Sequence, residues 1–306
     1  MQRLRQFNPA MLAVLLAATL WGTLGVYYEI VDRHVDVDRL TVVTLRATGA
    51  TIVLVLWWNW RDRSVFCVGR RDLPIFVAMG LASVTAFYIF LIYTFVYTSV
   101  AVGTLLLYMA PAFVTIGAAC FLGERLTRSK IVALLVSFVG CALVVEITRP
   151  GAISGNAKGI LLGLASAICY ASYSLMAKPM LTRYRGATIQ TVHMIFGSVA
   201  LLLVKLIVSP GDWPSILQVV VLSLVGGIAI SVVPVALYTY GLSNLPSSEA
   251  SILATWEPVV AVLLAAIVLD ERLGAVQTVG ACLVVAAVVI LGRSTSSRRA
   301  EVIVEP

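Results

Sequence analysis

Residues 108–127 read YMAPAFVTIGAACFLGERLT, and residues 255–274 read TWEPVVAVLLAAIVLDERLG. At one constant offset of 147 positions the two stretches share seven residues in 20, among them Pro111 with Pro258 and a Glu-Arg-Leu triplet. Each is a long apolar run that contains a helix breaker and ends in a charged pair. Their recurrence at a fixed spacing indicates an internally duplicated chain.

The composition around these stretches is too apolar for a protein that faces water on all sides. Of the 306 residues, 60% are hydrophobic and 12% are charged, whereas a soluble domain carries roughly 25% charged residues. Runs such as AMLAVLLAATL lack the polar–apolar alternation of a barrel strand. Ten runs are long enough to cross a bilayer as helices, and we number them spans 1–10: 10–28, 40–60, 73–94, 99–121, 131–147, 158–177, 188–208, 216–240, 247–269 and 275–292.

The duplication divides the chain into two halves of five spans, residues 10–147 and 158–292. Because each half has an odd number of spans, the second half enters the membrane the opposite way up. The sequence thus predicts an all-α integral membrane protein with ten transmembrane helices in an inverted repeat, an arrangement common among secondary transporters. The short polar tail, 293–306, is predicted to be disordered.

Lysine and arginine predict the orientation. With the N-terminus in the cytoplasm, the inner segments carry 15 of these residues, the outer segments carry 6, and Arg46 lies within span 2. Such an excess on the inner side is the usual topology signal. We therefore expect a protein of the cytoplasmic membrane with both termini inside. The net charge of +7 is spread over loops, which argues against a nucleic-acid partner.

A proline-broken span that ends in GERL, repeated as EPVVAVLLAAIVLDERL after LSNLPSSEAS, resembles the EamA-type members of the drug/metabolite transporter superfamily. Trp21 and Gly22 in span 1 are similar to the family's usual opening. The resemblance implies export of amino acids, drugs or other small metabolites by alternating access. It also implies a central cavity surrounded by spans 1, 3, 4, 6, 8 and 9, with spans 2 and 7 outside it and spans 5 and 10 packed at the back.

The two prolines are the predicted hinges. A proline has no N–H to bond the residue four positions earlier, so Pro111 should free the carbonyl of Leu107 and Pro258 that of Ala254. Such a carbonyl in lipid must find another partner. A plain packing kink is the alternative for each proline alone, and their pairing favours a functional bend near mid-membrane.

Glu257 distinguishes the two halves, since Ala110 occupies the equivalent position in the first. A charge at the centre of a spanning helix costs about 2.5–3.5 kcal/mol on insertion scales. Glu257 is either a proton- or amine-binding carboxylate in the cavity, or a structural group that satisfies the broken helix or pairs with Arg46. For Arg46 and for His193, its counterpart in span 7, structural roles are favoured, with an ion pair for Arg46.

Deep aromatic residues are the other candidates for substrate binding: Trp21, Tyr88, Tyr108, Tyr170 and Trp256. Tyrosine hydroxyls offer hydrogen bonds without a buried charge, which suits a weakly selective pocket. The alternative is an interfacial aromatic belt. At the ends of the two apolar runs, Glu124 and Glu271 are interpreted as residues that set the membrane topology and cap the next helix. Thr127 is interpreted as the N-cap of span 5.

Absent motifs narrow the function. The sequence has no GxxxxGK[ST] loop, no HExxH and no Cys or His residues at metal-ligand spacing, so we expect no cofactor, no metal and no enzymatic activity. A channel and a membrane enzyme stay as minor alternatives. The favoured function is secondary export of small metabolites, with amino acids first and protons as a candidate coupling ion. The second choice is efflux of lipophilic or cationic drugs, for which Glu257 would supply the counter-charge.

Overall fold

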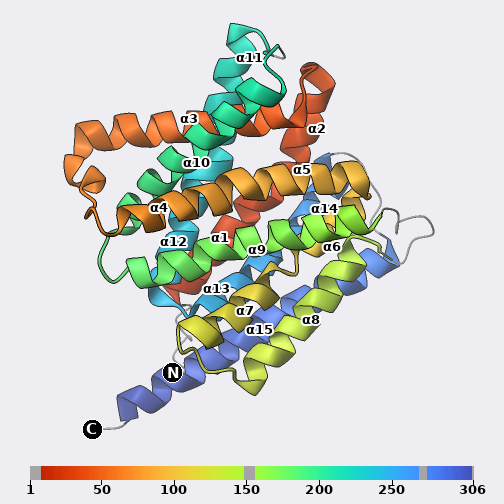
Figure 1. The fold of residues 1–306 in the computed structure, drawn as a ribbon. Coiled ribbons are helices and arrows are strands. Elements are labelled where there is room, and N and C mark those ends of the chain that lie inside the picture. The colour runs from red at the N-terminus through yellow and green to blue at the C-terminus, as the bar shows by residue number, and fades with distance from the viewer. Residues whose placement is uncertain (1–7, 148–155, 212, 269–273, 305–306) are drawn as a thin grey trace.

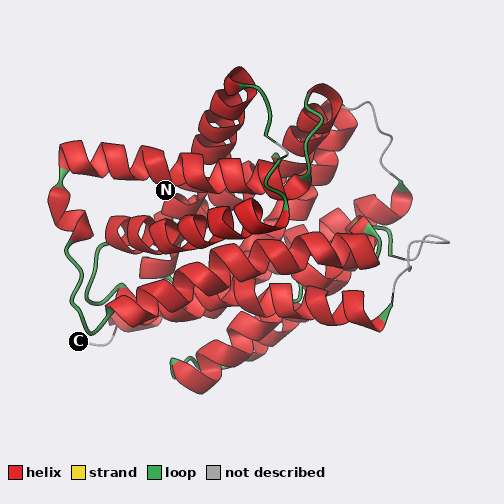
Figure 2. Ribbon diagram, turned by 45° about the horizontal axis from the view of Figure 1, so that its top comes forward, coloured by secondary structure: helices red, strands yellow, loops and turns green. Residues whose placement is uncertain are grey.

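The computed structural model describes residues 8–147, 156–211, 213–268 and 274–304, and the side chains as far as residue 293. Within these ranges every regular element is a helix (Figure 2). Nine of the predicted spans are helical segments of at least 18 residues that are apolar enough to cross a membrane. The tenth, span 5, is a helix of 17 residues, which is the lower limit for crossing. The predicted all-α membrane fold is confirmed.

The first half contains eight α-helices and two short segments, in which several spans are interrupted. In chain order they are α1 (Pro9–Gly22) and α2 (Leu24–His34) in span 1, α3 (Arg39–Arg61) in span 2, the short η1 (Arg63–Phe66), α4 (Leu73–Gly80), η2 (Leu81–Ala86) and α5 (Phe87–Tyr97) in span 3, α6 (Val100–Leu107) and α7 (Ala110–Phe121) in span 4, and α8 (Arg128–Val144) in span 5.

The second half repeats this pattern except in span 6, which is one continuous helix whereas span 1 is divided. It consists of α9 (Ala157–Met180) in span 6, α10 (Gly186–Val208) in span 7, α11 (Ile216–Val221), η3 (Leu222–Val232) and α12 (Val233–Asn244) in span 8, α13 (Ser247–Leu253), η4 (Ala254–Trp256) and α14 (Glu257–Val268) in span 9, and α15 (Ala275–Val304) in span 10. Spans 3, 4, 8 and 9 are thus each built from shorter helical pieces, at corresponding places in the two halves.

Side-chain caps fix where several helices begin. An N-cap oxygen accepts a hydrogen bond from a backbone N–H that the first turn leaves without a partner. Asn8 caps α1 and Asn156 caps α9, the first helix of each half, through bonds to Ala10 N (3.1 Å) and Gly159 N (3.0 Å). Thr127 caps α8 as predicted, with Lys130 N donating to its hydroxyl at 3.4 Å.

Spans 5 and 10 pack against each other along one side of the bundle (Figure 1). Their close approach depends on two glycines. A β-carbon at Gly140 would lie 2.8 Å from the carbonyl oxygen of Gly280, and one at Gly280 would lie 2.6 Å from that of Gly140. Small residues that allow backbones to touch are the usual means of helix association in lipid. This pair places α8 and α15 at the back of the bundle, opposite α3 and α11.

The C-terminal segment differs from its prediction. The sequence predicts a disordered tail from residue 293, but α15 continues as a helix to Val304. A spanning helix supplies an already formed turn on which additional residues add one hydrogen bond each, so extension avoids the cost of nucleation. Polar composition alone does not stop a helix that has already begun.

The orientation stays a prediction, and reporter fusions test it. Fusions after residues 65 and 185 should report a cytoplasmic location, and a fusion after residue 151 an external one, because lysine and arginine are concentrated on the inner side. Alkaline phosphatase and a fluorescent protein, which are active on opposite sides of the membrane, give complementary signals at each position. A cytoplasmic signal at residue 151 would refute the opposite insertion of the two halves.

Candidate functional site

A cavity of about 500 Å³ lies inside the bundle. The residues that line it come from spans 1–4 and 6–9, whereas none of them belongs to α8 or α15. At one end the lining includes Glu29, Asp32 and Arg39, whose side chains are 43–48% exposed. We call this end the mouth. It lies where α2 turns into α3, and Arg39 and Asp32 face each other there at 3.7 Å.

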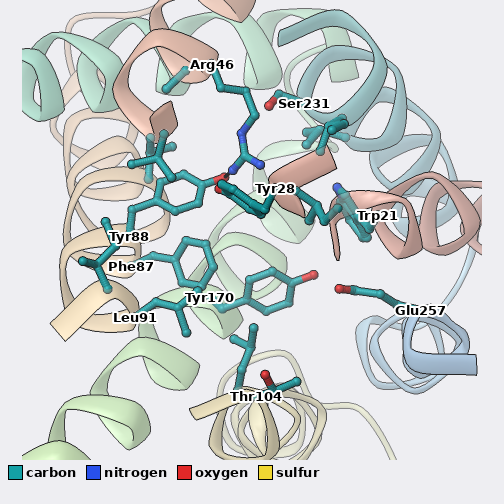
Figure 3. A pocket seen from close by; sticks show the side chains of 18 of the residues that line it. Trp21, Tyr28, Arg46, Phe87, Tyr88, Leu91, Thr104, Tyr170, Ser231 and Glu257 are labelled. Atoms are coloured by element: carbon teal, nitrogen blue, oxygen red, sulfur yellow. Dashed lines mark hydrogen bonds between the residues drawn. The ribbon is translucent and has the colours of Figure 1, made fainter. Parts of the chain in front are cut away.

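Aromatic side chains gather on the cavity wall (Figure 3). The rings are also packed on one another: the centroid of Tyr170 lies 5.3 Å from that of Phe87 and 6.5 Å from that of Trp21. Trp21 in turn lies 5.6 Å from Tyr238. Ring pairs at these distances stabilise each other beyond simple burial. The wall is therefore a connected aromatic layer contributed by α1, α5, α9 and α12.

Hydrogen bonds between α9 and α12 close the end opposite the mouth. Tyr173 and Thr239 share a bond of 2.5 Å, and Ser174 and Tyr238 one of 2.8 Å. Below them, the Lys178 ammonium donates to the carbonyls of Leu242 and Leu245, both at 2.7 Å. These bonds form a polar floor between the cavity and the part of the bundle beyond it.

Two π-helical segments border the cavity at corresponding places in the two halves. The segment η2 occupies 81–86, and the offset of 147 moves it to 228–233, which overlaps η3 at 222–232. Ser83 and Val84 of η2 and Ile230 and Ser231 of η3 line the cavity. Widened turns of this kind are rare and occur mostly at functional sites. Neither segment contains a proline, although Pro234 directly follows η3 in the first turn of α12.

The proline-broken spans face each other beside this cavity. Span 4 is interrupted at Tyr108 and Met109, just before Pro111, and span 9 at η4, just before Pro258. A second cavity of about 30 Å³ lies between the two breaks. The carbonyl that Pro258 was expected to free, that of Ala254, accepts the N–H of Glu257 through a tighter 3₁₀ turn. Both interruptions were predicted, and the hinge role stays a prediction.

Glu257 lines both cavities. Its carboxylate points into the larger one, and the Tyr170 hydroxyl points toward it from the other side (Figure 3). Within the described part of the chain, no hydrogen bond or ion pair reaches this carboxylate. The structural alternative in which Glu257 pairs with Arg46 is therefore not observed, and the backbone carbonyl beside it already has a partner.

Arg46 corrects two expectations. It lines the cavity although span 2 was expected to lie outside, and its guanidinium donates to the Tyr88 hydroxyl instead of to a carboxylate. His193 of span 7 also lines the cavity, with its ring 5.1 Å from that of Tyr173. The α3 helix comes this close because Gly226 and Gly227 of η3 leave room for it. Family resemblance placed the helix and could not show which of its faces turns inward.

Five of the six predicted substrate-binding residues lie on the cavity wall: Trp21, Tyr88, Tyr108, Tyr170 and Glu257. Trp256 does not. Its indole N–H donates to the Thr19 hydroxyl at 3.2 Å, and its ring packs near Cys141 and Val259. The substrate-binding candidates chosen from the sequence left out Tyr28, Arg46 and Tyr238, which also line the cavity. A charged residue at membrane depth is by default a functional candidate, and that signal could have identified Arg46. Whether these residues bind substrate stays a prediction.

Comparison with known families decides what kind of protein carries this cavity. The profile of the EamA-like transporter family matches residues 8–146 and again residues 157–293. The chain belongs to this family. The two matches also coincide with the two halves defined by the repeat, so this EamA transporter is a ten-helix protein made of two family units.

Its relatives are named as transporters. An uncharacterized transporter of Archaeoglobus fulgidus is 31% identical over 292 residues, 92% of this chain and 95% of the relative. A "Probable terminal-alkyne amino-acid exporter" of Streptantibioticus cattleyicolor is 27% identical, over 76% of this chain and 77% of the relative. One solved crystal structure superposes with a TM-score of 0.80 at 19% identity, covering 95% of this chain and 98% of the other. It shows the shared fold alone.

A buried charge cluster joins the two halves of the EamA transporter beyond the closed end of the cavity. Glu124, expected to serve the adjacent helix α8, instead caps α13 of the other half: it accepts Ser247 N at 2.5 Å and the Ser248 hydroxyl at 2.5 Å. Lys130 lies 3.3 Å from Glu124 and 3.9 Å from Glu249. Glu271, the repeat counterpart of Glu124, lies outside the described residues.

This cluster predicts a pH-dependent loss of stability on mutation. Burial would raise the pKa of Glu124, but the bonds from Ser248 and Ser247 and the charge of Lys130 lower it below its ordinary value of 4.5. Stability from such a group is present at neutral pH and is lost as the pH falls through its lowered pKa. Glu124→Gln should therefore destabilise the protein by about 2 kcal/mol at pH 7, and the difference should vanish well below pH 4.5.

Thermal unfolding in detergent at several pH values measures this effect. Asp36→Asn is the matched control, since Asp36 is an exposed carboxylate on the loop between α2 and α3. That variant should unfold with the wild type at every pH. An equal destabilisation of Glu124→Gln at pH 7 and at a pH well below 4.5 would show that shape, and not charge, holds the two halves together here.

Proposed function

We propose that this protein is a secondary transporter of the cytoplasmic membrane that exports small metabolites, amino acids foremost, by alternating access. The central cavity carries this proposal: it is open at one end, closed at the other by a few hydrogen bonds, and lined from both halves of the repeat. Its volume of about 500 Å³ is that of a typical small-molecule site. Rocking of the two halves would open the floor and close the mouth.

The relatives support the choice of amino acids. The exporter of Streptantibioticus cattleyicolor is named for an amino-acid substrate and matches across both halves of this chain at 27% identity over 231 residues. The cavity wall offers groups that an amino acid could bind. Aromatic rings could contact its side chain, tyrosine hydroxyls its polar groups, and Glu257 its ammonium group.

Direction follows from the predicted orientation. If the N-terminus is cytoplasmic, α1 and α2 run outward and the mouth at Glu29 and Asp32 faces the outside. The structure would then be the outward-open state, from which an exporter has released its substrate. Efflux of lipophilic or cationic drugs is the second candidate, because Glu257 could serve a cation. Arg46 on the same cavity would repel such a cation, and we therefore rank this function lower.

Transport by purified protein in proteoliposomes tests the proposal. The panel contains labelled amino acids and labelled cationic drugs, each measured with and without an imposed pH gradient. We expect saturable flux of at least one amino acid above protein-free liposomes. Flux of the cationic drugs alone would favour the second candidate function, drug efflux. Flux that does not saturate and does not depend on the pH gradient would indicate a channel.

A further inference from the structure

We propose that Arg46 is the anion-binding group of the cavity and that the transported molecule carries a carboxylate. The inference rests on the proposed function, since it assumes that the substrate occupies this cavity. It adds the substrate's chemistry and assigns the residue that recognises it. The sequence predicted a structural ion pair for Arg46, so this role comes from the structure.

The first observation is that Arg46 is buried without a counter-charge. The residue is 2% exposed. One guanidinium nitrogen, Nη2, donates to the Tyr88 hydroxyl. The other two, Nε and Nη1, have no hydrogen-bond partner among the described residues. An arginine keeps its proton under all ordinary conditions, so a full positive charge with two buried and unpartnered donors lies beside the cavity.

The second observation is that the other buried or half-buried cations of the structure are satisfied. Lys130 lies 3.3 Å from Glu124, and Lys205 lies 3.4 Å from Asp38. Lys178 donates to two backbone carbonyls. Arg39, at the mouth of the same cavity, has Asp32. In contrast, the described part of the chain offers Arg46 only a tyrosine hydroxyl and aromatic faces.

The third observation is how Arg46 is held. Its guanidinium carbon lies 5.1 Å from the ring centroid of Tyr88 and 5.8 Å from that of Tyr28. Aromatic faces stabilise a cation without neutralising it. The group also points into the cavity between these two rings (Figure 3). This arrangement fixes the orientation of the guanidinium and leaves its charge available, which is the geometry of a binding site for an anion.

The charges that line the cavity favour a monoanion with an amino group. They are Glu29, Asp32, Arg39, Arg46 and Glu257, three acids and two bases. Since Arg39 and Asp32 are paired, Arg46 is the one cation left for a ligand among the lining residues described. A carboxylate accepts charge-assisted hydrogen bonds from it, whereas a dianionic phosphate would face an excess of acid. Glu257 across the cavity could hold the ammonium of the same molecule (Figure 3).

Matched pairs of acids and amides test this proposal. The probes are L-phenylalanine with L-phenylalaninamide and L-leucine with L-leucinamide, at about pH 6, below the ordinary α-amino pKa of about 7.7–8.0. Within each pair the amide lacks only the carboxylate charge. Affinity is measured as protection against thermal unfolding in detergent, and as inhibition of flux in proteoliposomes. The proteins are the wild type, Arg46→Gln, Arg46→Lys and the control Arg63→Gln, at an exposed arginine near the opposite end of α3.

We expect the wild type and Arg63→Gln to bind acids at least tenfold more tightly than amides. In Arg46→Gln the ratio should fall to about one, with no loss of stability in the absence of ligand, because an uncompensated buried charge has been removed. Arg46→Lys should retain part of the preference. If Arg46→Gln does not fold, Arg46→Met takes its place, and an acid-to-amide ratio in that variant equal to the wild-type ratio overturns the proposal.

The outcomes separate this inference from the proposed function. Amides that bind the wild type as tightly as acids, or a ratio that Arg46→Gln leaves unchanged, overturn the role of Arg46 while amino-acid transport stands. Flux of cationic drugs with no binding of either acids or amides overturns both. A structural role for Arg46 would weaken acids and amides equally, so the ratio is the measurement that such a role would not move.

Discussion

Glu257→Gln is expected to remove the response of transport to pH while the protein stays folded and inserted. Glutamine keeps the shape of the side chain but cannot take up or release a proton. The Glu257 carboxylate lies on the cavity wall with no partner among the described residues, so its loss leaves no buried charge behind. If protons drive export through Glu257, the variant still exchanges labelled for unlabelled substrate. An imposed pH gradient, however, no longer drives accumulation of the substrate.

A second outcome would assign Glu257 to the substrate. If the carboxylate binds the ammonium, Glu257→Gln loses affinity for amines at every pH. A charge-assisted hydrogen bond contributes about 1.5–3 kcal/mol, so the loss should be about tenfold to 150-fold in apparent affinity. Exchange and gradient-driven flux in the same proteoliposomes distinguish the two outcomes.

Glu257→Asp is the matched control for both outcomes, proton coupling and ammonium binding. It keeps a titratable carboxylate one methylene shorter, so a reduced flux that still responds to pH is expected. Normal affinity together with a normal pH response in a folded Glu257→Gln protein would leave Glu257 with a structural role beside Pro258 only.

Replacing the paired prolines should slow transport without weakening the fold. Pro111 and Pro258 lie in the first turns of α7 and α14, where proline is tolerated. In an uninterrupted span each would lie in a helix interior, where alanine is favoured over proline by about 3 kcal/mol, so Pro111→Ala and Pro258→Ala should allow spans 4 and 9 to straighten. Their breaks face each other across the small cavity beside the site. We expect about a tenfold loss of flux for each variant, corresponding to a barrier about 1.4 kcal/mol higher, and more for the double variant.

Pro74→Ala provides the comparison. Pro74 also lies in the first turn of a helix, α4, but it does not line either cavity. This variant should transport like the wild type. Wild-type exchange by inserted Pro111→Ala and Pro258→Ala proteins would reduce both bends to packing features, and the π-helical segments η2 and η3 would then be the next candidates for hinges.

The sequence was sufficient for the spans and the repeat because the bilayer imposes length and polarity on every crossing segment. The identities at an offset of 147 were enough to place Pro111 and Pro258 in equivalent breaks. No proline pair at this offset marks η2 and η3, although Pro234 directly follows η3. A π-turn needs only about one extra residue per turn. Packing between helices stabilises it, and a single sequence does not reveal that packing.

Side-chain direction was the harder problem, as Trp256 and Arg46 show. Trp256 lies in a 3₁₀ turn, where each residue advances by about 120° instead of 100°, so an ideal helix gives the wrong face for it. Arg46 faces inward because α3 packs closely on the glycines of η3. That contact joins segments about 180 residues apart, and only the tertiary structure reveals it.

Modification of a cysteine inside the cavity tests most directly whether substrate passes through it. Thr104 lines the cavity on α6 (Figure 3), and Thr104→Cys would be made after replacing Cys67, Cys120, Cys141, Cys169 and Cys282. Right-side-out vesicles would be treated with a membrane-impermeant maleimide, with Asp36→Cys on the exposed loop as the control. We predict that the reagent abolishes flux through Thr104→Cys, that a transported amino acid slows this inactivation, and that Asp36→Cys is labelled but keeps its flux. Full transport after complete labelling of Thr104→Cys would contradict the account.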